Sequence, residues 1–408
     1  MSDKDNLIIT LHNGLRVVCR RRPGLVSYIG LVVNAGSRDE DSQHEGLAHF
    51  VEHTLFKGTD KRRAWQISSR METVGGELNA YTSKEETVVY TNAPSGYENR
   101  ALELLADLVS SSRFPHHEIE LEREVVVEEI NSYLDTPSER VFDEFEELAY
   151  KGSGLAHNIL GTAESVRTLD SKECRQFLDR FYQPQNIVLY CVTPFPVDKM
   201  AAKAERIFSF MKNYPVIHNR IVPPPMDIFN EVRNKDSHQA NTVMGARTFS
   251  RDDSRRFALF LLNNYLGGPC MNSRLNRELR EKRGLVYAVD SSVSLLSDTG
   301  LWTLYYACDP SHIEKCRKVI AREIDSLCQH TLSQQAFEKV KRQYCGQLLS
   351  TSDHIESRAI SLGKSILYFD TVHDISTTAE RIMEVKSEEM RSAAEMIAFE
   401  KLSSLSLT

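Results

Sequence analysis

The sequence predicts an α+β protein with two similar α/β-sandwich domains from an internal duplication, each a mainly antiparallel sheet covered by helices. Three observations lead to this prediction. Strand-like alternation and helical spacing of apolar residues are interleaved along the chain. Short segments recur in the same order in the two halves of the 408 residues. A run of prolines at positions 223–225 divides the chain near its middle.

The first half shows the interleaved pattern most clearly. Two strands are expected around the Asn13-Gly14 turn within residues 7–21, because Asn-Gly between alternating segments is a strong hairpin signal. A further strand is expected within residues 27–36. Helices are expected over residues 46–56, 64–74, 97–112 and 116–134, and a strand pair over residues 78–94.

The recurrence joins segments that lie 210–216 residues apart. Short loop insertions account for the small drift in this spacing. A period this long indicates duplication of a whole domain rather than a solenoid of short repeats. The paired segments are residues 37–39 with 250–252, 47–58 with 257–268, and 88–98 with 304–314.

The prolines at positions 223–225 favour a stiff, extended linker, because proline fits neither a helix interior nor a central strand. We therefore expect a first domain over residues 1–212, a linker over residues 213–232 and a second domain over residues 233–408. Each domain is long enough to bury its own hydrophobic core.

The composition and net charge exclude several classes of protein. Hydrophobic residues make up 41% and charged residues 26% of the chain, which excludes a disordered or fibrous protein. The net charge of −7 argues against nonspecific nucleic-acid binding. The eight cysteines form no C-x-x-C pair, so no Cys-based zinc ribbon is expected, and their scatter is typical of free thiols in a reducing compartment.

The sequence also bears on location. The N-terminal residues are polar and acidic and do not resemble a secretory or transit segment. No run of about 18 apolar residues occurs, so no membrane span is expected. These features predict a cytoplasmic protein, with an exported form that has lost a leader as the alternative.

Residues His49 to His53 form an H-x-x-E-H motif within an expected helix. On a helix the two histidines lie one turn apart on one face, so both imidazoles can reach a single Zn²⁺. Glu52 shares that face and is not needed as a ligand, so it is free to take a proton from water. Such a catalytic site needs a third protein ligand, usually a carboxylate.

The second half strengthens this interpretation. Its matching positions hold Leu259, Leu262 and Asn263. If the three positions only filled a core, apolar residues would serve there, as two of them do in the second half. Ionisable groups in their place favour a metal site in the first half.

The expected helix of residues 116–134 is rich in glutamate and is the obvious source of the third ligand. Glu122 and Glu129 are seven residues apart and share a face. Apolar residues at positions 125, 126 and 130 indicate that this helix is partly buried. The other glutamates are expected to be solvated or ion-paired, namely Glu118, Glu120, Glu124 and Glu128.

The setting of the motif, GLAHFVEHTLFKGT, resembles the peptidases with an inverted zinc motif. It is most similar to the M16 peptidase family, in a short two-domain form like the bacterial processing-peptidase-like proteins. The likeness extends through GGELNAYTSKEETVVY and IELEREVVVEEI and returns in the second half at LGGPCMNSRLNRELREKRGLVYAV. It covers most of the chain, and the motifs together are highly specific.

The resemblance implies roles for individual residues. His49 and His53 would be zinc ligands, and Glu52 would be the general base. The family's third ligand is a glutamate about 76 residues after the second histidine, which here is Glu129. These four residues would form the centre of the site.

Glu122, seven residues before Glu129, matches the family's supporting carboxylate. The resemblance places it among the catalytic residues, where it would orient a ligand or tune its basicity. The alternative is an ion pair on the helix surface with Arg123 or with a basic residue elsewhere.

Two segments resemble the family's substrate-binding elements. Asn79, Ala80 and Tyr81 match the active-site edge strand, to which an extended peptide can add through backbone hydrogen bonds; the alternative is an ordinary internal strand. Arg280 and Tyr287 match a second-domain pair that would grip the substrate backbone and polarise its carbonyl or stabilise the oxyanion. The alternatives are a solvated arginine and a half-buried core tyrosine.

The resemblance implies a zinc-dependent endopeptidase with one Zn²⁺ per chain, which hydrolyses unfolded peptides in a closed chamber of four such domains. Because this chain supplies two domains, a second subunit must supply the others. The chain holds both the zinc set and the Arg/Tyr pair, so a homodimer is expected. The alternatives are the catalytic subunit of a heterodimeric processing peptidase, a non-catalytic scaffold homologue, and a different hydrolase with the same zinc chemistry.

Overall fold

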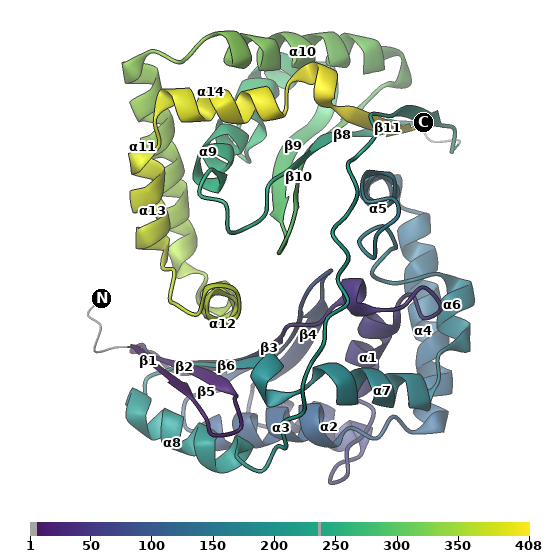
Figure 1. The fold of residues 1–408 in the computed structure, drawn as a ribbon, viewed down its shortest axis with the longest axis vertical. Helices are drawn as coiled ribbons and strands as arrows, with labels where there is room; N and C mark the ends of the chain where they lie inside the picture. Colours follow the sequence, from purple (N-terminus) through teal and green to yellow (C-terminus); the bar gives the residue numbers. More distant parts are fainter. Residues whose placement is uncertain (1–5, 236–237) are drawn as a thin grey trace. The chain divides into compact units, whose positions relative to one another are not determined.

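The computed structural model describes residues 6–235 and 238–408 and contains two compact units. The first unit consists of the described part of Met1–Asn131, with His157–Arg220 and Asp353–His373. The second consists of Ser132–Ala156, the described part of Ile221–Ser352, and Asp374–Thr408. Helices cover a sheet in each unit (Figure 1), so the predicted α+β fold class is confirmed.

The sheet of the first unit has six strands in the order β1-β2-β6-β3-β5-β4. β1 and β2 pair antiparallel around the Asn13-Gly14 turn, and β4 and β5 form the second predicted pair. β2 and β6 are parallel, so the sheet is mixed although mainly antiparallel. The strand bounds are β1 Asn6–Thr10, β2 Arg16–Arg21, β3 Val26–Val33, β4 Glu77–Thr82, β5 Thr87–Pro94 and β6 Ile187–Thr193.

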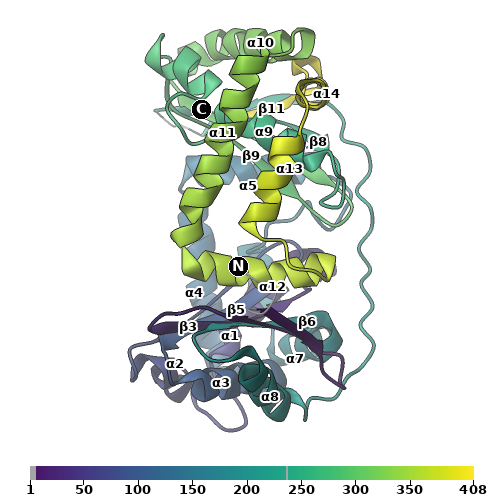
Figure 2. The ribbon, with the colours of Figure 1, turned by 90° about the vertical axis from the view of Figure 1, so that its left-hand side faces the viewer.

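Helices cover both faces of this first sheet. On one face they bury the apolar side chains that alternate along the strands, such as Leu31 and Leu189. A single helix, α12 (Ile355–Phe369), lies on the other face against Val32 and Tyr190 (Figure 2). The helices of the first face are α1 Leu47–Leu55, α2 Ala64–Glu72, α3 Glu98–Ser111, α4 His116–Leu134, α6 Ala163–Thr168, α7 Ser171–Phe181 and α8 Val197–Phe208, with short 3-10 turns at η2 Ser37–Asp39 and η3 Pro184–Asn186.

The sheet of the second unit has the strand order β7-β11-β8-β10-β9. Its strands are β7 Asn230–Arg233, β8 Ala240–Thr248, β9 Val286–Leu295, β10 Gly300–Cys308 and β11 Ser403–Leu407. One face is covered by α9 Arg256–Gly267, α10 Ile313–Gln329, α11 Gln334–Ser350, α13 Ile375–Glu384 and α14 Ser387–Met396. The other face is covered by α5 Pro137–Ala149. Short helical segments are η4 Asn276–Glu281, η5 Pro310–His312, η6 Thr351–Asp353 and η7 Phe399–Lys401.

The two sheets share one topology, which supports the predicted duplication. The strands β2, β6, β3, β5 and β4 correspond in order to β7, β11, β8, β10 and β9, and β1 is an addition at one edge. The pairs β2/β6 and β7/β11 are both parallel, and the other pairs of both sheets are antiparallel. The helices α1 and α9 occupy equivalent places after β3 and β8.

The compact units differ from the predicted contiguous ranges because two helices are exchanged. α5 comes from the first half and covers the second sheet, whereas α12 comes from the second half and covers the first sheet. Gly363 lets α12 lie close, because a Cβ there would be 2.6 Å from the Tyr190 ring and 2.8 Å from Val32. Division of the chain at the linker would therefore separate each sheet from one of its covering helices.

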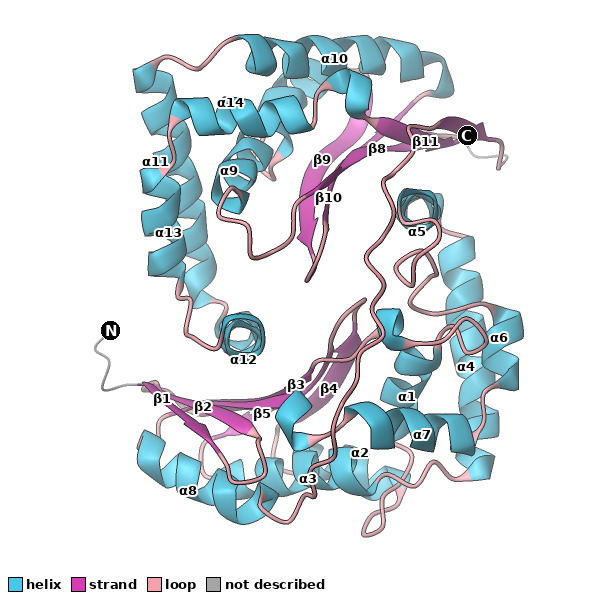
Figure 3. Ribbon diagram, in the orientation of Figure 1, coloured by secondary structure: helices cyan, strands magenta, loops and turns pink. Residues whose placement is uncertain are grey.

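The segment between α8 and β7 contains neither helix nor strand (Figure 3), and it carries the run of prolines. Its first part is held by the first unit. Asp39 accepts hydrogen bonds from Nδ1 of His218 and from Nη2 of Arg220, each at 2.7 Å. The segment is thus anchored as far as Arg220.

Two further sequence predictions can be compared with the fold. All eight cysteines are free, as their scatter predicts. In the described ranges, no helix combines the length and the apolar character that a membrane crossing requires.

Candidate metal centre

The helix α1 carries the H-x-x-E-H motif and begins at a position that requires glycine. Its N-cap, Gly46, has a φ of 91°, which is in the left-handed region. A Cβ at this position would lie 2.5 Å from the carbonyl oxygen of Leu160, so the close approach also requires glycine. Beyond this start, the rings of His49 and His53 have centroids 4.5 Å apart. The two imidazoles therefore lie together on one face of α1, as predicted.

Glu129 of α4 completes a group of three side chains that can bind a metal. Its Oε2 lies 3.5 Å from Nε2 of His53 and 3.8 Å from Nε2 of His49. One ligand atom of each residue lies within 4.8 Å of the others, and within the described ranges no second group of this kind occurs. The neighbouring Glu128 is exposed, so the two adjacent glutamates have different surroundings.

The rest of α4 is largely as predicted. Val126 and Ile130 are buried, but Val125 is 52% exposed because it lies on the outer side of the helix. Ile119 and Val127 are buried as well, so the predicted partial burial of this helix is correct although Val125 does not contribute to it. Exposed or partly exposed positions include Glu118, Glu120, Glu124 and Glu128.

The pKa values of the two histidines are shifted in opposite directions. Burial and the neighbouring His53 lower the pKa of His49 to about 3, so its imidazole is neutral near neutral pH. Neutral imidazole is the form that binds a metal. Burial would also lower the pKa of His53, but Glu122, Glu52 and Glu129 outweigh it and the net shift is upward. In the described structure, the buried Nδ1 of His49 has no hydrogen-bond partner.

Glu122 contacts one of these histidines directly. Its Oε1 lies 2.9 Å from Nδ1 of His53, and its Oε2 lies 2.5 Å from Nζ of Lys57. Burial raises the pKa of Glu122, but His53 and Lys57 outweigh this effect and the pKa falls below its ordinary value. Arg123, the ion-pair partner considered above, instead donates to the carbonyl oxygen of Leu169 at 2.8 Å.

Glu52 lies beside the same group and receives one hydrogen bond. Its Oε2 accepts from Oγ1 of Thr82 at 2.7 Å, and the side chain is largely buried. Burial raises the pKa of Glu52 despite the opposing effects of Thr82 and His53. A carboxyl group with a raised pKa beside metal-binding side chains is suited to general base chemistry near neutral pH.

The segment with Asn79, Ala80 and Tyr81 lies in β4, which is the last strand in the order of its sheet. The alternative of an internal strand is therefore wrong. Successive side chains of a strand point to opposite faces. Ala80 packs on the core beneath α1 and its neighbouring helices, whereas Tyr81 lies on the α12 face, with Nζ of Lys364 5.3 Å from its ring centroid.

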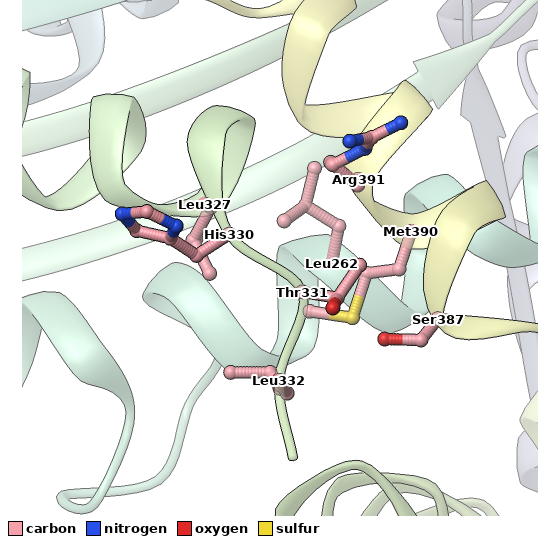
Figure 4. Close-up of a pocket in the computed structure, with 8 residues that line it drawn as sticks. All are labelled: Leu262, Leu327, His330, Thr331, Leu332, Ser387, Met390 and Arg391. Carbon is pink, nitrogen blue, oxygen red and sulfur yellow. The ribbon is translucent and has the colours of Figure 1, made fainter. Parts of the chain in front are cut away.

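The equivalent place in the second unit is a packed core. Leu259 and Leu262 of α9 are fully buried. Asn263 accepts a hydrogen bond from Nε1 of Trp302 at 2.9 Å and donates one to the carbonyl oxygen of Ser291 at 3.0 Å. Leu262 borders a pocket of about 10 Å³ between α9, α10 and α14 (Figure 4), which has room for about one water molecule at most.

Arg280 and Tyr287 both belong to the second unit. Arg280 lies in the π-helical segment η4 and is partly exposed, with Nε 4.0 Å from Oε1 of Glu281. Tyr287 lies on β9, the last strand of its sheet, and is 67% exposed. The alternative of a half-buried core tyrosine is therefore wrong.

Sequence reasoning missed two side chains that contact the predicted group. Thr82 shares the strand face of Ala80, so the two-residue period of β4 would have directed it toward α1. Lys57 lies four residues after His53, just beyond the end of α1. Its spacing from the motif was a usable signal, but its partner on α4 was not visible from local sequence.

Comparison with known proteins agrees with this geometry. Residues 16–163 match the family model described as Insulinase (Peptidase family M16), and residues 168–344 match that of the Peptidase M16 inactive domain. An uncharacterized zinc protease of Mycobacterium leprae is 32% identical, over 95% of this chain and 88% of its own. YmxG, an uncharacterized zinc protease of Bacillus subtilis, is 31% identical, over 88% and 87%. The chain belongs to peptidase family M16, so the predicted family and class of enzyme are confirmed.

Solved structures show the same fold at lower sequence identity. A protease from Helicobacter pylori has a TM-score of 0.92 with 22% identity and covers 99% of both chains. A peptidase M16 inactive domain from Pseudomonas fluorescens has a TM-score of 0.90 with 20% identity and covers 98% of this chain and 97% of its own. The duplicated two-sheet architecture is therefore shared with solved proteins.

Proposed function

We propose that this chain is a zinc-dependent endopeptidase that hydrolyses unfolded peptides. The observation that carries the proposal is the group formed by His49, His53 and Glu129, whose ligand atoms lie within 4.8 Å of one another. The carboxyl group of Glu52 lies on the same helix face. Membership of a peptidase family and relatives that are named zinc proteases support the same conclusion.

The donor set fits zinc. Two imidazole nitrogens and one carboxylate oxygen form a common ligand set of catalytic zinc sites, which keep a fourth position open. His49 offers a neutral nitrogen because its pKa is about 3. Glu122 holds Nδ1 of His53, which leaves Nε2 on the side of Glu129. We expect one Zn²⁺ per chain, held by these three ligands.

Side chains of this chain are assigned to proton transfer and to positioning. When bound, zinc would polarise the scissile carbonyl and make water more acidic. Glu52 accepts a proton from the attacking water on its carboxylate and returns it to the leaving amine. Thr82 holds one oxygen of Glu52, which restricts the rotation of that carboxylate. Glu122, expected to be catalytic, acts in this proposal through His53 as a positioning residue.

Substrate would be held by backbone and by side chains. The free edge of β4 offers backbone hydrogen bonds to an extended peptide at Asn79, Ala80 and Tyr81. Arg280 and Tyr287 would hold the substrate backbone and its carbonyl oxygen. The exposure of Tyr287 supports a role outside the core of the second unit. Loss of activity in Arg280→Lys and Tyr287→Phe, with zinc content unchanged, would test this assignment.

We further propose a homodimer that encloses the substrate in a chamber. The presence of both the metal-binding group and the Arg/Tyr pair on one chain supports identical subunits over the heterodimeric alternative. The complete group also disfavours a non-catalytic scaffold. The cytoplasmic location belongs to the same proposal, and the eight free cysteines support a reducing compartment.

The test uses zinc-loaded wild type, Glu52→Gln, Glu129→Gln and Glu128→Gln with a long quenched fluorescent peptide. We expect Glu52→Gln to keep its zinc and to lower kcat by about 10²–10⁴-fold, because only the base is removed. Glu129→Gln should lose zinc and activity together. Glu128→Gln is the matched control, because the same change one residue away lies on an exposed position.

Three outcomes separate the alternatives. Equal activity in wild type and Glu52→Gln would mean a contaminant and would overturn the proposal. Inactive, zinc-loaded wild type that becomes active on addition of a cell extract would favour the heterodimeric form. Light scattering on the active protein measures the oligomeric state, and a monomer would overturn the homodimer.

A further inference from the structure

Glu40 lies in the loop before α1 and caps that helix from outside. Its carboxylate is fully buried; Oε1 accepts the backbone N–H of Ala48 at 2.6 Å, and Oε2 accepts that of Gly46 at 2.8 Å. The first N–H groups of a helix have no partner within it. The N-cap of α1 is a glycine and its first turn has no acidic residue, so the helix has no cap of its own. Glu40 supplies what the helix lacks.

The same carboxylate joins a second segment to the start of α1. Nε2 of His157 lies 2.9 Å from Oε2 of Glu40, and Nζ of Lys84 donates to the carbonyl oxygen of His157 at 2.7 Å. Because Gly46 has no Cβ, the carbonyl oxygen of Leu160 can lie close to it. Burial raises the pKa of Glu40, although the hydrogen bonds from His157, Ala48 and Gly46 lower it. Burial of this carboxylate is therefore energetically unfavourable in itself. The start of α1 and the segment of His157, which are distant in sequence, thus meet at the side chain of Glu40.

We propose that Glu40 is a positioning residue for the metal centre, which sets the orientation of α1 and hence of His49 and His53. The inference rests on the proposed zinc-dependent function. α1 spans only Leu47–Leu55, and His49 lies in its first turn, next to one of the two capped amides. A shift at the start of the helix is therefore transmitted to His49 within a single residue.

The physical consequence of losing the cap is direct. Without the carboxylate, the buried N–H groups of Gly46 and Ala48 lose their partners. The positive end of the helix dipole also loses its compensating negative charge. The first turn can recover hydrogen bonds only by unwinding or rotating, and either change moves the imidazole of His49 away from Glu129.

The test compares Glu40→Gln with Asp41→Asn. The two backbone N–H groups bind different oxygens of Glu40, and in Gln an NH₂ group replaces one of these oxygens, so one N–H group loses its acceptor. Asp41 is the adjacent, exposed residue, so it undergoes the same chemical change away from α1. Zinc affinity is measured by competition with a chromophoric chelator, and the geometry of the site by the visible spectrum of Co²⁺ added to the metal-free protein. Melting of the metal-free protein is recorded in parallel.

We expect Glu40→Gln to weaken zinc binding by about 10- to 100-fold, as for other groups that orient ligands, and to alter the Co²⁺ spectrum. kcat should fall with KM unchanged, and Asp41→Asn should match wild type. A Glu40→Gln protein with a lower melting temperature but wild-type zinc affinity and Co²⁺ spectrum would overturn the inference, because Glu40 would then only stabilise the fold. Wild type that binds no zinc would instead refute the proposed function.

A second variant covers the case in which Glu40→Gln does not fold. His157→Gln leaves both backbone hydrogen bonds of Glu40 in place and removes its ring partner. We expect weaker zinc binding than in wild type, by a smaller factor than for Glu40→Gln. A zinc affinity equal to that of wild type in the folded His157→Gln protein would overturn the inference.

Discussion

Oγ1 of Thr82 donates a hydrogen bond to Oε2 of Glu52 at 2.7 Å, and this bond joins the edge strand β4 to the helix α1. Thr82 pairs with Thr87 of the neighbouring strand, so its position is set by the sheet. The orientation of Glu52 thus depends on the same strand whose free edge we propose as the peptide-binding site. In the proposed function, β4 would therefore both bind the substrate and orient the carboxylate of the general base.

Thr82→Val tests whether the hydrogen bond from Thr82 orients Glu52. The substitution keeps the shape of the side chain and removes the donor, so Glu52 gains rotational freedom. We expect kcat to fall about tenfold, equivalent to about 1.4 kcal/mol, with zinc content unchanged. Thr82→Ser keeps the hydroxyl group and should stay close to wild type. A Thr82→Val enzyme with the kcat of wild type would contradict the proposed role.

Glu122→Gln tests the contact between Glu122 and His53. The amide cannot accept from Nδ1 of His53 and from Lys57 with the strength of a carboxylate. We expect zinc affinity to fall by about 10- to 100-fold, measured by chelator competition. Glu124→Gln, on an exposed position of the same helix, is the control. Equal zinc affinity in the two variants would contradict a positioning role and would mean that Glu122 only forms an ion pair with Lys57.

Lys364→Met tests how α12 is held on the first sheet. Nζ of Lys364 lies 2.6 Å from Oε1 of Glu86, and the hydroxyl of Tyr368 donates to the same carboxylate. Burial raises the pKa of Glu86, but Lys364 and Tyr368 outweigh it and the pKa lies below 4.5. Burial lowers the pKa of Lys364, but Glu86 outweighs it and the pKa lies above 10.5.

These directions define a pH window. A depressed carboxyl pKa stabilises the fold above pH 4.5, and the effect is lost as pH falls through the folded value. A raised lysine pKa stabilises it below pH 10.5, and the effect is lost as pH rises through the folded value. Urea unfolding near neutral pH should show a loss of about 2 kcal/mol in Lys364→Met, which shrinks at acid pH. The same loss well below pH 4.5 would contradict the assignment.

Asn263→Leu tests the equivalent place in the second unit. The variant leaves the indole N–H of Trp302 buried without its partner. We expect a loss of about 1–3 kcal/mol in the free energy of unfolding, with zinc affinity and kcat/KM equal to wild type. Weaker zinc binding in this variant would show that the second unit influences the metal centre.

Local patterns predict much of this fold. The Asn13-Gly14 turn, the helix expected over residues 64–74 and the alternation over residues 78–94 correspond to a hairpin, to α2 and to the pair β4 and β5. The strand β6 and the strands of the second half were not predicted individually. Among them β7 and β11 are short and acquire their structure by pairing, β7 with β11 and β11 also with β8. Periodicity also cannot reveal which sheet a helix covers, so the exchange of α5 and α12 was missed.

The residues of the site also fall into those that the local sequence predicts and those that depend on tertiary contacts. His49, Glu52 and His53 share a helix, and their mutual placement follows from helical spacing alone. The choice of Glu129 over Glu128 depended on a family resemblance, because the contact between α1 and α4 is a tertiary one. Glu40 and Thr82 reach α1 from other segments; the alternation of β4 points Thr82 toward α1, but no local pattern marks Glu40.

The exchange of helices bears on the order in which the chain can fold during synthesis. The strands of the first sheet are complete at Thr193, but the helix that covers Val32 and Tyr190 is made only with Ile355–Phe369. The second sheet waits even longer, because β11, Ser403–Leu407, lies between β7 and β8. A nascent chain therefore carries an uncovered apolar face of the first sheet from the synthesis of Thr193 until α12 is made, and the second unit closes later, when β11 is made.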